Sequence, residues 1–174
     1  MAAAGTNGAT GDAFVALVRQ HLGIIRRLTR IYGETLQERE DLEQEICLQL
    51  WKAFPGFAGR SRPSTWVYGV ALNTAISALR RRLRRPTAEE LHDVAVPGGE
   101  REAGERRDVL YAAIRRLNDG ERALVLLWLE ELPYEQIAEV LGLSVGAVSV
   151  RLVRAREKLR RLVGAPAPRR TGER

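Results

Sequence analysis

Cysteine and histidine are scarce in this sequence of 174 residues, which contains one cysteine, Cys47, and two histidines, His21 and His92. One cysteine excludes an internal disulfide, and two scattered histidines provide no ligand set for a metal ion. The sequence also shows no Ser/His/Asp or Cys/His arrangement and no glycine-rich phosphate loop. We therefore predict a protein that is not an enzyme and that needs no metal or cofactor.

Long apolar runs are absent as well, and none approaches the length of a membrane-spanning helix. The N-terminal stretch MAAAGTNGATG lacks both the basic region and the apolar region of a signal peptide. These absences predict a cytoplasmic protein that is not inserted into a membrane.

Lysine is rare, because only Lys52 and Lys158 among the 28 basic residues are lysine and all the others are arginine. Arginine is well suited to paired hydrogen bonds with phosphates and base edges, but a GC-rich genome would give the same bias. The positions of the charges say more. Residues 60–85 contain seven arginines and no acidic residue, and residues 144–174 are a second basic segment. Acidic segments lie between them, a layout typical of two nucleic-acid contacts on one chain.

Helical spacing of apolar residues predicts three helices in the first half of the chain. Thr35 and Glu38 fit a capping box at the start of the second helix, and Pro86 sets the end of the third. The expected segments are a disordered N-terminus over residues 1–11, a helix from its cap at Asp12 to a stop at Gly33, a helix from Thr35 to about Phe54, a loop over residues 55–64 and a helix that ends by Arg85.

The second half is predicted to be a separate helical domain. Residues 86–105 are rich in glycine and charge and read as a flexible linker, so the fold class is all-α with two small helical domains. The expected parts are domains over residues 12–85 and 106–163 and a disordered tail over residues 164–174. Within the second domain, Asn118 and Pro133 favour helix starts.

The stretch PYEQIAEVLGLSVGAVSVRLVRAREKL has the form of a helix-turn-helix motif. Gly142 is placed at the turn, and Ser144 is the expected cap of the second helix. In such a motif the second helix enters the major groove of DNA. A plain three-helix bundle with a basic end is the alternative interpretation.

Two surface strips stand out on the predicted helices of the first domain. On the third helix, Trp66, Asn73, Ser77, Arg80 and Arg84 share one face, beside an apolar face that can pack. On the second helix, Asp41, Gln44, Glu45 and Leu48 follow the spacing i, i+3, i+4, i+7. Each strip is also compatible with a merely solvated charged surface.

Together these segments resemble an extracytoplasmic-function (ECF) sigma factor of bacterial RNA polymerase, in the sigma-70 family. EDLEQEICLQLWKAF is similar to region 2.2 of that family, STWVYGVALNTAISALRRRLRR to regions 2.3 and 2.4, and the helix-turn-helix to region 4.2. The resemblance covers residues 12–85 and 106–163. The order of the three motifs is more specific than any one of them.

The resemblance implies three partners: core RNA polymerase, through its beta-prime clamp and beta flap, promoter DNA, and an anti-sigma factor. It implies that residues 86–105 run toward the active-site and RNA-exit path of the polymerase. The polymerase-binding residues would be Asp41, Gln44, Glu45 and Leu48. Those for the minus-ten element would be Arg60, Ser61, Arg62, Ser64, Trp66, Asn73, Ser77, Arg80, Arg81 and Arg84, with Arg82 and Arg85 adding to a cationic track.

For the minus-thirty-five element, the resemblance implies contacts from Val145, Gly146, Ala147, Ser149, Arg151, Arg154 and Arg156. The sequence departs from the family at two places. Pro63 stands where the family often has an aromatic residue, and Ser149-Val150 stands where it usually has more basic or polar residues.

Two other functional classes compete with this interpretation. A stand-alone helix-turn-helix regulator would bind duplex DNA without polymerase, but it leaves the strips at Asp41–Glu45 and at Trp66 and Asn73 unexplained. An interaction protein would use both basic segments to bind an acidic partner. Run-off transcription with core polymerase separates these classes.

Overall fold

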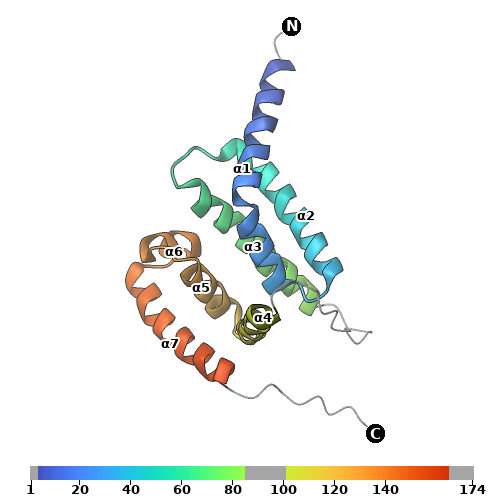
Figure 1. Cartoon of the computed structure of the whole chain (residues 1–174). Helices are drawn as coiled ribbons and strands as arrows, with labels where there is room; N and C mark the ends of the chain where they lie inside the picture. Colours follow the sequence, from blue (N-terminus) through green and yellow to red (C-terminus); the bar gives the residue numbers. More distant parts are fainter. Residues whose placement is uncertain (1–3, 85–100, 165–174) are drawn as a thin grey trace. The chain divides into compact units, whose positions relative to one another are not determined.

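The structure is a computed structural model that describes residues 4–84 and 101–164 and places the side chains of residues 10–84 and 107–164. Over these ranges the chain is helical and contains no strand (Figure 1), which confirms the predicted fold class. The elements are α1 (Ala4–Tyr32), α2 (Leu36–Ala53), the short 3-10 helix η1 (Phe54–Gly56), α3 (Pro63–Leu83), α4 (Arg101–Arg115), α5 (Asp119–Leu129), α6 (Tyr134–Leu141) and α7 (Val145–Gly164).

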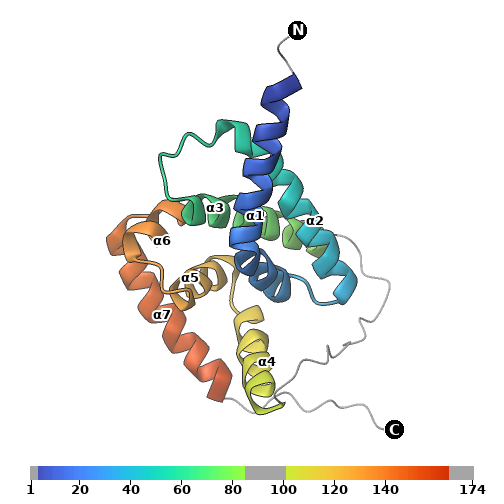
Figure 2. The ribbon, with the colours of Figure 1, turned by 45° about the horizontal axis from the view of Figure 1, so that its top comes forward.

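Helices α1, α2 and α3 form the first of two compact units, and each of them packs against the other two (Figure 2). The fully buried side chains are aliphatic and come from all three helices. They include Ile25, Leu28 and Ile31 of α1, Ile46 and Leu50 of α2, and Val67 and Leu72 of α3. Burying such side chains is the main driving force for this bundle. The apolar spacing that predicted these helices is therefore the spacing of their core.

His21 is also buried in this unit, and its Nδ1 donates a hydrogen bond to the Leu17 carbonyl over 2.8 Å. It is thus a packed helix residue. The cysteine of the chain, Cys47, is half-buried on α2. Burial raises the pKa of its thiol, and the nearby Glu43 carboxylate adds to the shift.

The turn between α1 and α2 depends on Gly33. A Cβ atom at this position would lie 2.9 Å from both the Thr29 carbonyl oxygen and Arg39 Cγ, closer than packed atoms approach. A larger residue at this position would therefore clash with its neighbours, so the turn requires glycine. The next helix starts with the predicted capping box, in which Thr35 accepts from the Glu38 amide and the Glu38 side chain accepts from the Thr35 amide.

The N-terminal boundary was predicted wrongly. Helix α1 begins at Ala4, so residues 4–11 are helical and Asp12 lies inside the helix rather than at its cap. Figure 1 shows the first turns of α1 extending beyond the rest of the first unit. Because the packed part of α1 has already formed, these residues extend a helix without a new nucleus, although they include the unfavourable Gly5, Gly8 and Gly11. Residues 1–3 lie outside the described part of the chain.

Helices α4 to α7 make up the second half of the described chain. The buried side chains include Ile114 of α4, Leu124 and Leu127 of α5, Ile137 of α6, and Val148 and Leu152 of α7. Asn118 and Glu121 form a second capping box at the start of α5, as predicted. Pro133 instead precedes its helix, and its carbonyl accepts from the amides of Gln136 and Ile137.

The predicted linker is too long at its C-terminal end. Helix α4 begins at Arg101, so residues 101–105 are helical, and Val109 on this helix is exposed. The rest of the predicted linker and the predicted tail beyond Gly164 lie outside the described residues.

The helix-turn-helix has its turn at Gly142 and its helix cap at Ser144, as predicted. Gly142 adopts a φ of +63°, and the Leu143 amide donates to the Ala138 carbonyl over 3.0 Å, which closes the end of α6. Ser144 Oγ accepts from the Ala147 amide and so caps α7. The axes of α6 and α7 differ by 96°, within the range of helix-turn-helix motifs.

Within residues 4–84 and 101–164, no single helix is long and apolar enough to cross a membrane. Helices α6 and α7 reach the necessary length and apolar character only when taken together, and they are bent by 96° between them.

Candidate nucleic-acid interface

A row of aromatic side chains fixes the start of α3 to the rest of the first unit. The Phe57 and Trp66 rings lie 4.8 Å apart between centroids, and Phe54 lies 6.4 Å from Trp66. The row continues through Phe14 of α1 to Trp51 of α2, each in an edge-to-face contact. Trp66 is half-buried, so one side of its indole is committed to packing. The sequence did not reveal this row, because its members are separated by loops.

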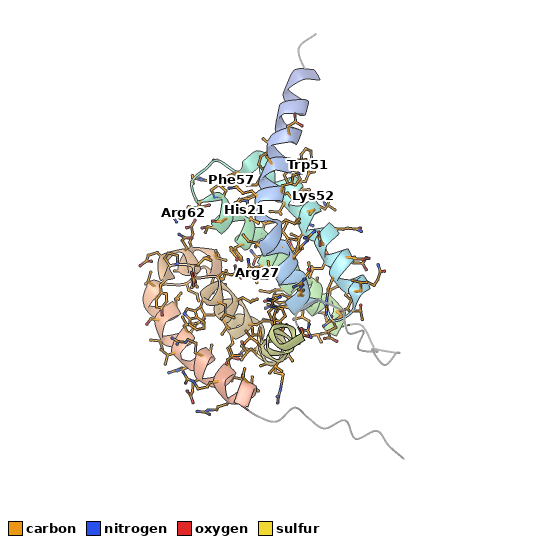
Figure 3. All side chains as sticks on the ribbon, viewed as in Figure 1. His21, Arg27, Trp51, Lys52, Phe57 and Arg62 are labelled. Carbon is orange, nitrogen blue, oxygen red and sulfur yellow. The ribbon has the colours of Figure 1, made fainter. Side chains whose placement is uncertain are left out.

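Of the predicted residues Arg60, Ser61, Arg62 and Ser64, the first three lie in the loop before α3, and Ser64 lies in the first turn of α3. Arg60 and Arg62 are exposed, whereas Ser61 and Ser64 are half-buried. Figure 3 shows Phe57 and Arg62 on this segment. Pro63 occupies the first position of α3, where its missing amide hydrogen is not needed.

The solvent-facing side of α3 matches the predicted stripe. Asn73, Ser77, Arg80 and Arg84 are exposed, and they follow Trp66 at helical spacing. The opposite side, including Ala71 and Thr74, is buried as expected. The exposed stripe offers an amide, a hydroxyl and guanidinium groups beside an aromatic ring, which suits single-stranded nucleic acid.

Two arginines of the predicted DNA-binding track are bound to acidic residues of the first unit instead. Arg81 Nη2 lies 2.6 Å from Glu45 Oε2. Arg82 contacts Glu38 at 2.5 Å and Glu34 at 2.7 Å. Both arginines therefore join the end of α3 to α2 and the turn before it, and they point to a different side from Arg80 and Arg84. Arg85 lies outside the described residues.

The predicted polymerase-binding strip lies on the outer side of α2. Asp41 and Gln44 are exposed, and Asp41 accepts a hydrogen bond from Gln37 over 2.9 Å. Glu45 is half-buried in its pair with Arg81. Leu48 is 50% exposed, and Trp51, three residues further on, is 44% exposed. Trp51 was missed in the sequence, although the spacing Asp41, Gln44, Leu48, Trp51 is that of a helix-packing seam.

Helix α7 separates its packing face from its exposed face. Val148, Leu152, Ala155 and Leu159 are buried, whereas the predicted residues Val145, Gly146, Ser149, Arg151 and Arg154 are exposed and Ala147 is half-buried. The exposed side also carries Val150 and Val153, of which Val153 was not predicted. The first twelve residues of α7 contain no acidic residue.

Arg156 has a contact that sets it apart from the other predicted arginines. Its guanidinium carbon lies 4.3 Å from the ring centroid of Trp128 on α5, in a cation–π arrangement. The next residues of α7 are also engaged, since Lys158 pairs with Glu121 at 2.7 Å and Glu157 with both Arg160 and Arg161. Arg151 and Arg154 are thus the better placed for DNA.

Comparison with known families identifies both halves of the chain. The family model described as Sigma-70 region 2 matches residues 17–85, and the model described as Sigma-70, region 4 matches residues 107–159. These ranges contain the α2 strip, the exposed side of α3 and the helix-turn-helix. They agree with the motifs on which the sequence resemblance rested.

The similar proteins are themselves named as sigma factors. The ECF RNA polymerase sigma factor SigG of Mycobacterium tuberculosis is 33% identical over 167 residues, covering 78% of this chain and 44% of SigG, so the chain spans less than half of that relative. The RNA polymerase sigma-H factor of Pseudomonas aeruginosa is 34% identical over 162 residues, covering 84% of each. The sigma factor RpoE of Bartonella quintana, solved with the anti-sigma factor NepR, has the same fold, with a TM-score of 0.68, 21% identity and coverage of 89% of this chain and 99% of that one.

Proposed function

Because the chain belongs to the extracytoplasmic-function sigma factors of the sigma-70 family, we propose that it binds core bacterial RNA polymerase and directs the enzyme to specific promoters. The observation that carries this proposal is the presence, on one chain, of three exposed surfaces in the order that the family requires. These are the α2 strip, the outer side of α3 and the N-terminal half of α7.

The first unit would dock on the polymerase through α2. Asp41 and Gln44 offer polar groups and Leu48 offers an exposed apolar side chain at a spacing that fits the side of a partner helix. Trp51 extends the same seam, and exposed tryptophans are frequent anchors of protein interfaces. The beta-prime clamp supplies the coiled coil that this seam would contact. Glu45 contributes less directly, because Arg81 already neutralises it.

The same unit would open the minus-ten element with α3. Melting requires a polar group for the edge of an unstacked base and a cationic path for its backbone. Asn73 supplies the first and Arg84 the second, and both are exposed on one side of α3. Trp66 packs on Phe57, so its proposed role is to hold the loop with Arg60 and Arg62 near the base.

The second unit would recognise the minus-thirty-five element with α7. The cap at Ser144 and the turn at Gly142 fix the start of α7, which in a helix-turn-helix would enter the major groove. The exposed Arg151 and Arg154 would contact phosphates or base edges, and the exposed Ser149 would contact a base edge. The beta flap of the polymerase is the proposed protein partner of this unit.

An anti-sigma factor is the proposed inhibitor of the chain. Support comes from the family and from the RpoE structure, whose partner is such a factor. Such a factor would inhibit the chain by covering a surface that polymerase or promoter DNA would otherwise use. A pull-down from the native host with the full chain as bait, and with Leu48→Arg as its matched control, tests whether the partner uses the α2 strip.

Run-off transcription tests the proposed function. Core polymerase is mixed with the full chain and a pool of genomic fragments, and transcripts are sequenced. We expect transcripts with a few defined start sites that are absent without the chain. Transcription that is the same with and without the chain would contradict the proposal and favour a regulator that acts without polymerase.

A further inference from the structure

Two valines stand on the side of α7 that points away from its core. Val150 is 55% exposed and Val153 is 65% exposed, in a helix that begins at Val145. With Gly146 they follow the spacing i, i+4, i+7, so the three residues lie along one line of the helix. The buried residues Val148 and Leu152 lie on the opposite side. The centre of the exposed side is therefore apolar.

Positive charge lies beside this line as far as Val153, and the next residue on the line is Glu157. Arg154 and Arg151 are exposed near the two valines, and no acidic residue precedes Glu157 in α7. Glu157 itself is held by Arg160 at 2.6 Å and by Arg161 at 3.2 Å. A polyanion approaching this side would meet arginines at the edges and methyl groups at the centre. A protein surface of mixed charge would fit it less well.

Space also favours a close approach of DNA at Gly146. A Cβ atom there would meet no atom within 4 Å, and the backbone is not left-handed, so the fold does not require glycine. Gly146 and Val153 are seven residues apart, which corresponds to about 10 Å along a helix. That length matches about three base-pair steps of B-DNA.

We propose that Val150 and Val153 read the 5-methyl groups of thymines in the major groove of the minus-thirty-five element. Apolar contact with this methyl group is a recognised mode of base readout, and thymine alone among the four bases carries a methyl group in the major groove. The inference rests on the proposed function. It also gives a role to the apolar Val150, which stands where the family usually has a more basic or polar residue. The readout would be hydrophobic at the centre and ionic at the edges.

Deoxyuridine provides the test, because it differs from thymidine in DNA only by the missing methyl group. A promoter found by run-off transcription is synthesised with deoxyuridine in the minus-thirty-five segment alone, and transcription is measured with core polymerase and the full chain. We expect a loss of about three- to fivefold for each thymine contacted, the change that corresponds to burying one methyl-sized group. Two contacts would give a loss of about 9- to 25-fold, since the two effects multiply.

A double variant shows whether the valines cause this effect. Val150→Ala with Val153→Ala should lose about tenfold on the thymine promoter and show no further loss on the deoxyuridine promoter. Alanine favours helix, so the variant should fold. Val109→Ala is the matched control, because Val109 is 52% exposed on α4 and has no proposed contact with DNA. It should keep the full difference between the two promoters.

Three outcomes would overturn the inference: equal transcription from both promoters, a double variant that still distinguishes them, or selected minus-thirty-five segments without thymine in either strand at the contacted positions. In each of these cases transcription still depends on the chain, so the proposed function stands. If the unsubstituted chain directed no promoter-specific transcription on the thymine promoter, that result would contradict the proposed function instead.

Discussion

Arg81 of α3 contacts Glu45 of α2 at 2.6 Å, which joins a residue predicted to bind DNA to one predicted to bind polymerase. The pair is partly exposed, so its contribution to stability is small. Its consequence is local: each side chain neutralises the other. The exposed residues Arg84 and Asp41 are therefore better tests of the two surfaces.

The first prediction compares two arginines of α3. Arg84→Ala should weaken promoter binding by the polymerase–chain complex and should lower the slope of log K against log salt by about 1, because one phosphate contact is lost. Arg81→Ala should change the slope less, since Glu45 already pairs with that arginine. The measurement is promoter affinity over a series of salt concentrations. Equal changes in slope would contradict the assignment of Arg84 to the DNA.

The second prediction concerns melting. Asn73→Ala should slow open-complex formation by about three- to tenfold, the effect of losing one hydrogen bond, while initial binding stays unchanged. Permanganate reactivity of thymines near the start site follows the opening over time. Gln20→Ala, exposed on α1, is the matched control. Normal opening by the Asn73 variant would count against a role in melting.

Arg82 is predicted to be structural. It links the end of α3 to Glu38 and Glu34, and Glu38 also belongs to the capping box of α2. Arg82→Ala should lower the free energy of unfolding of the first unit by about 1–2 kcal/mol. Arg84→Ala should change it by less than about 0.5 kcal/mol. Urea denaturation measures the free energy of unfolding of both variants. If Arg82→Ala leaves that free energy unchanged, the structural role is contradicted and Arg82 is again a candidate for binding DNA.

A stabilising change is predicted at the end of α5. Glu131 has a φ of 58°, a left-handed conformation that glycine adopts without strain. Glu131→Gly should raise the free energy of unfolding by about 0.5–1 kcal/mol. Glu139→Gly, in the exposed side of α6, should lower it by about 1 kcal/mol. Urea denaturation of the two variants measures both changes in the free energy of unfolding. A Glu131→Gly variant that is less stable than the unsubstituted chain would contradict the expected relief of backbone strain.

Local features of this fold were predictable from the sequence, and long-range pairs were not. The caps at Thr35, Asn118 and Ser144 each act on an amide three residues away, so their chemistry is visible in the sequence. The buried faces follow from helical spacing alone. The contact of Arg81 with Glu45 depends on how two helices rotate against each other, which spacing does not determine.

The candidate site divides in the same way. Exposure of Asn73, Arg84, Arg151 and Arg154 agrees with the faces drawn from the sequence. Arg156 is different, because its partner Trp128 belongs to another helix 28 residues away. The helical residues 4–11 and 101–105 were missed because glycine and charge weaken the periodic pattern there. The contacts with polymerase and DNA stay predictions.

The central claim is that the chain opens promoters only together with core polymerase. The most direct measurement is permanganate reactivity of a promoter fragment found by run-off transcription, with the chain alone, with core polymerase alone and with both. Reactive thymines near the start site only in the third mixture are the predicted result. Full protection of the same fragment by the chain alone, unchanged by core polymerase and without any strand opening, would contradict the account.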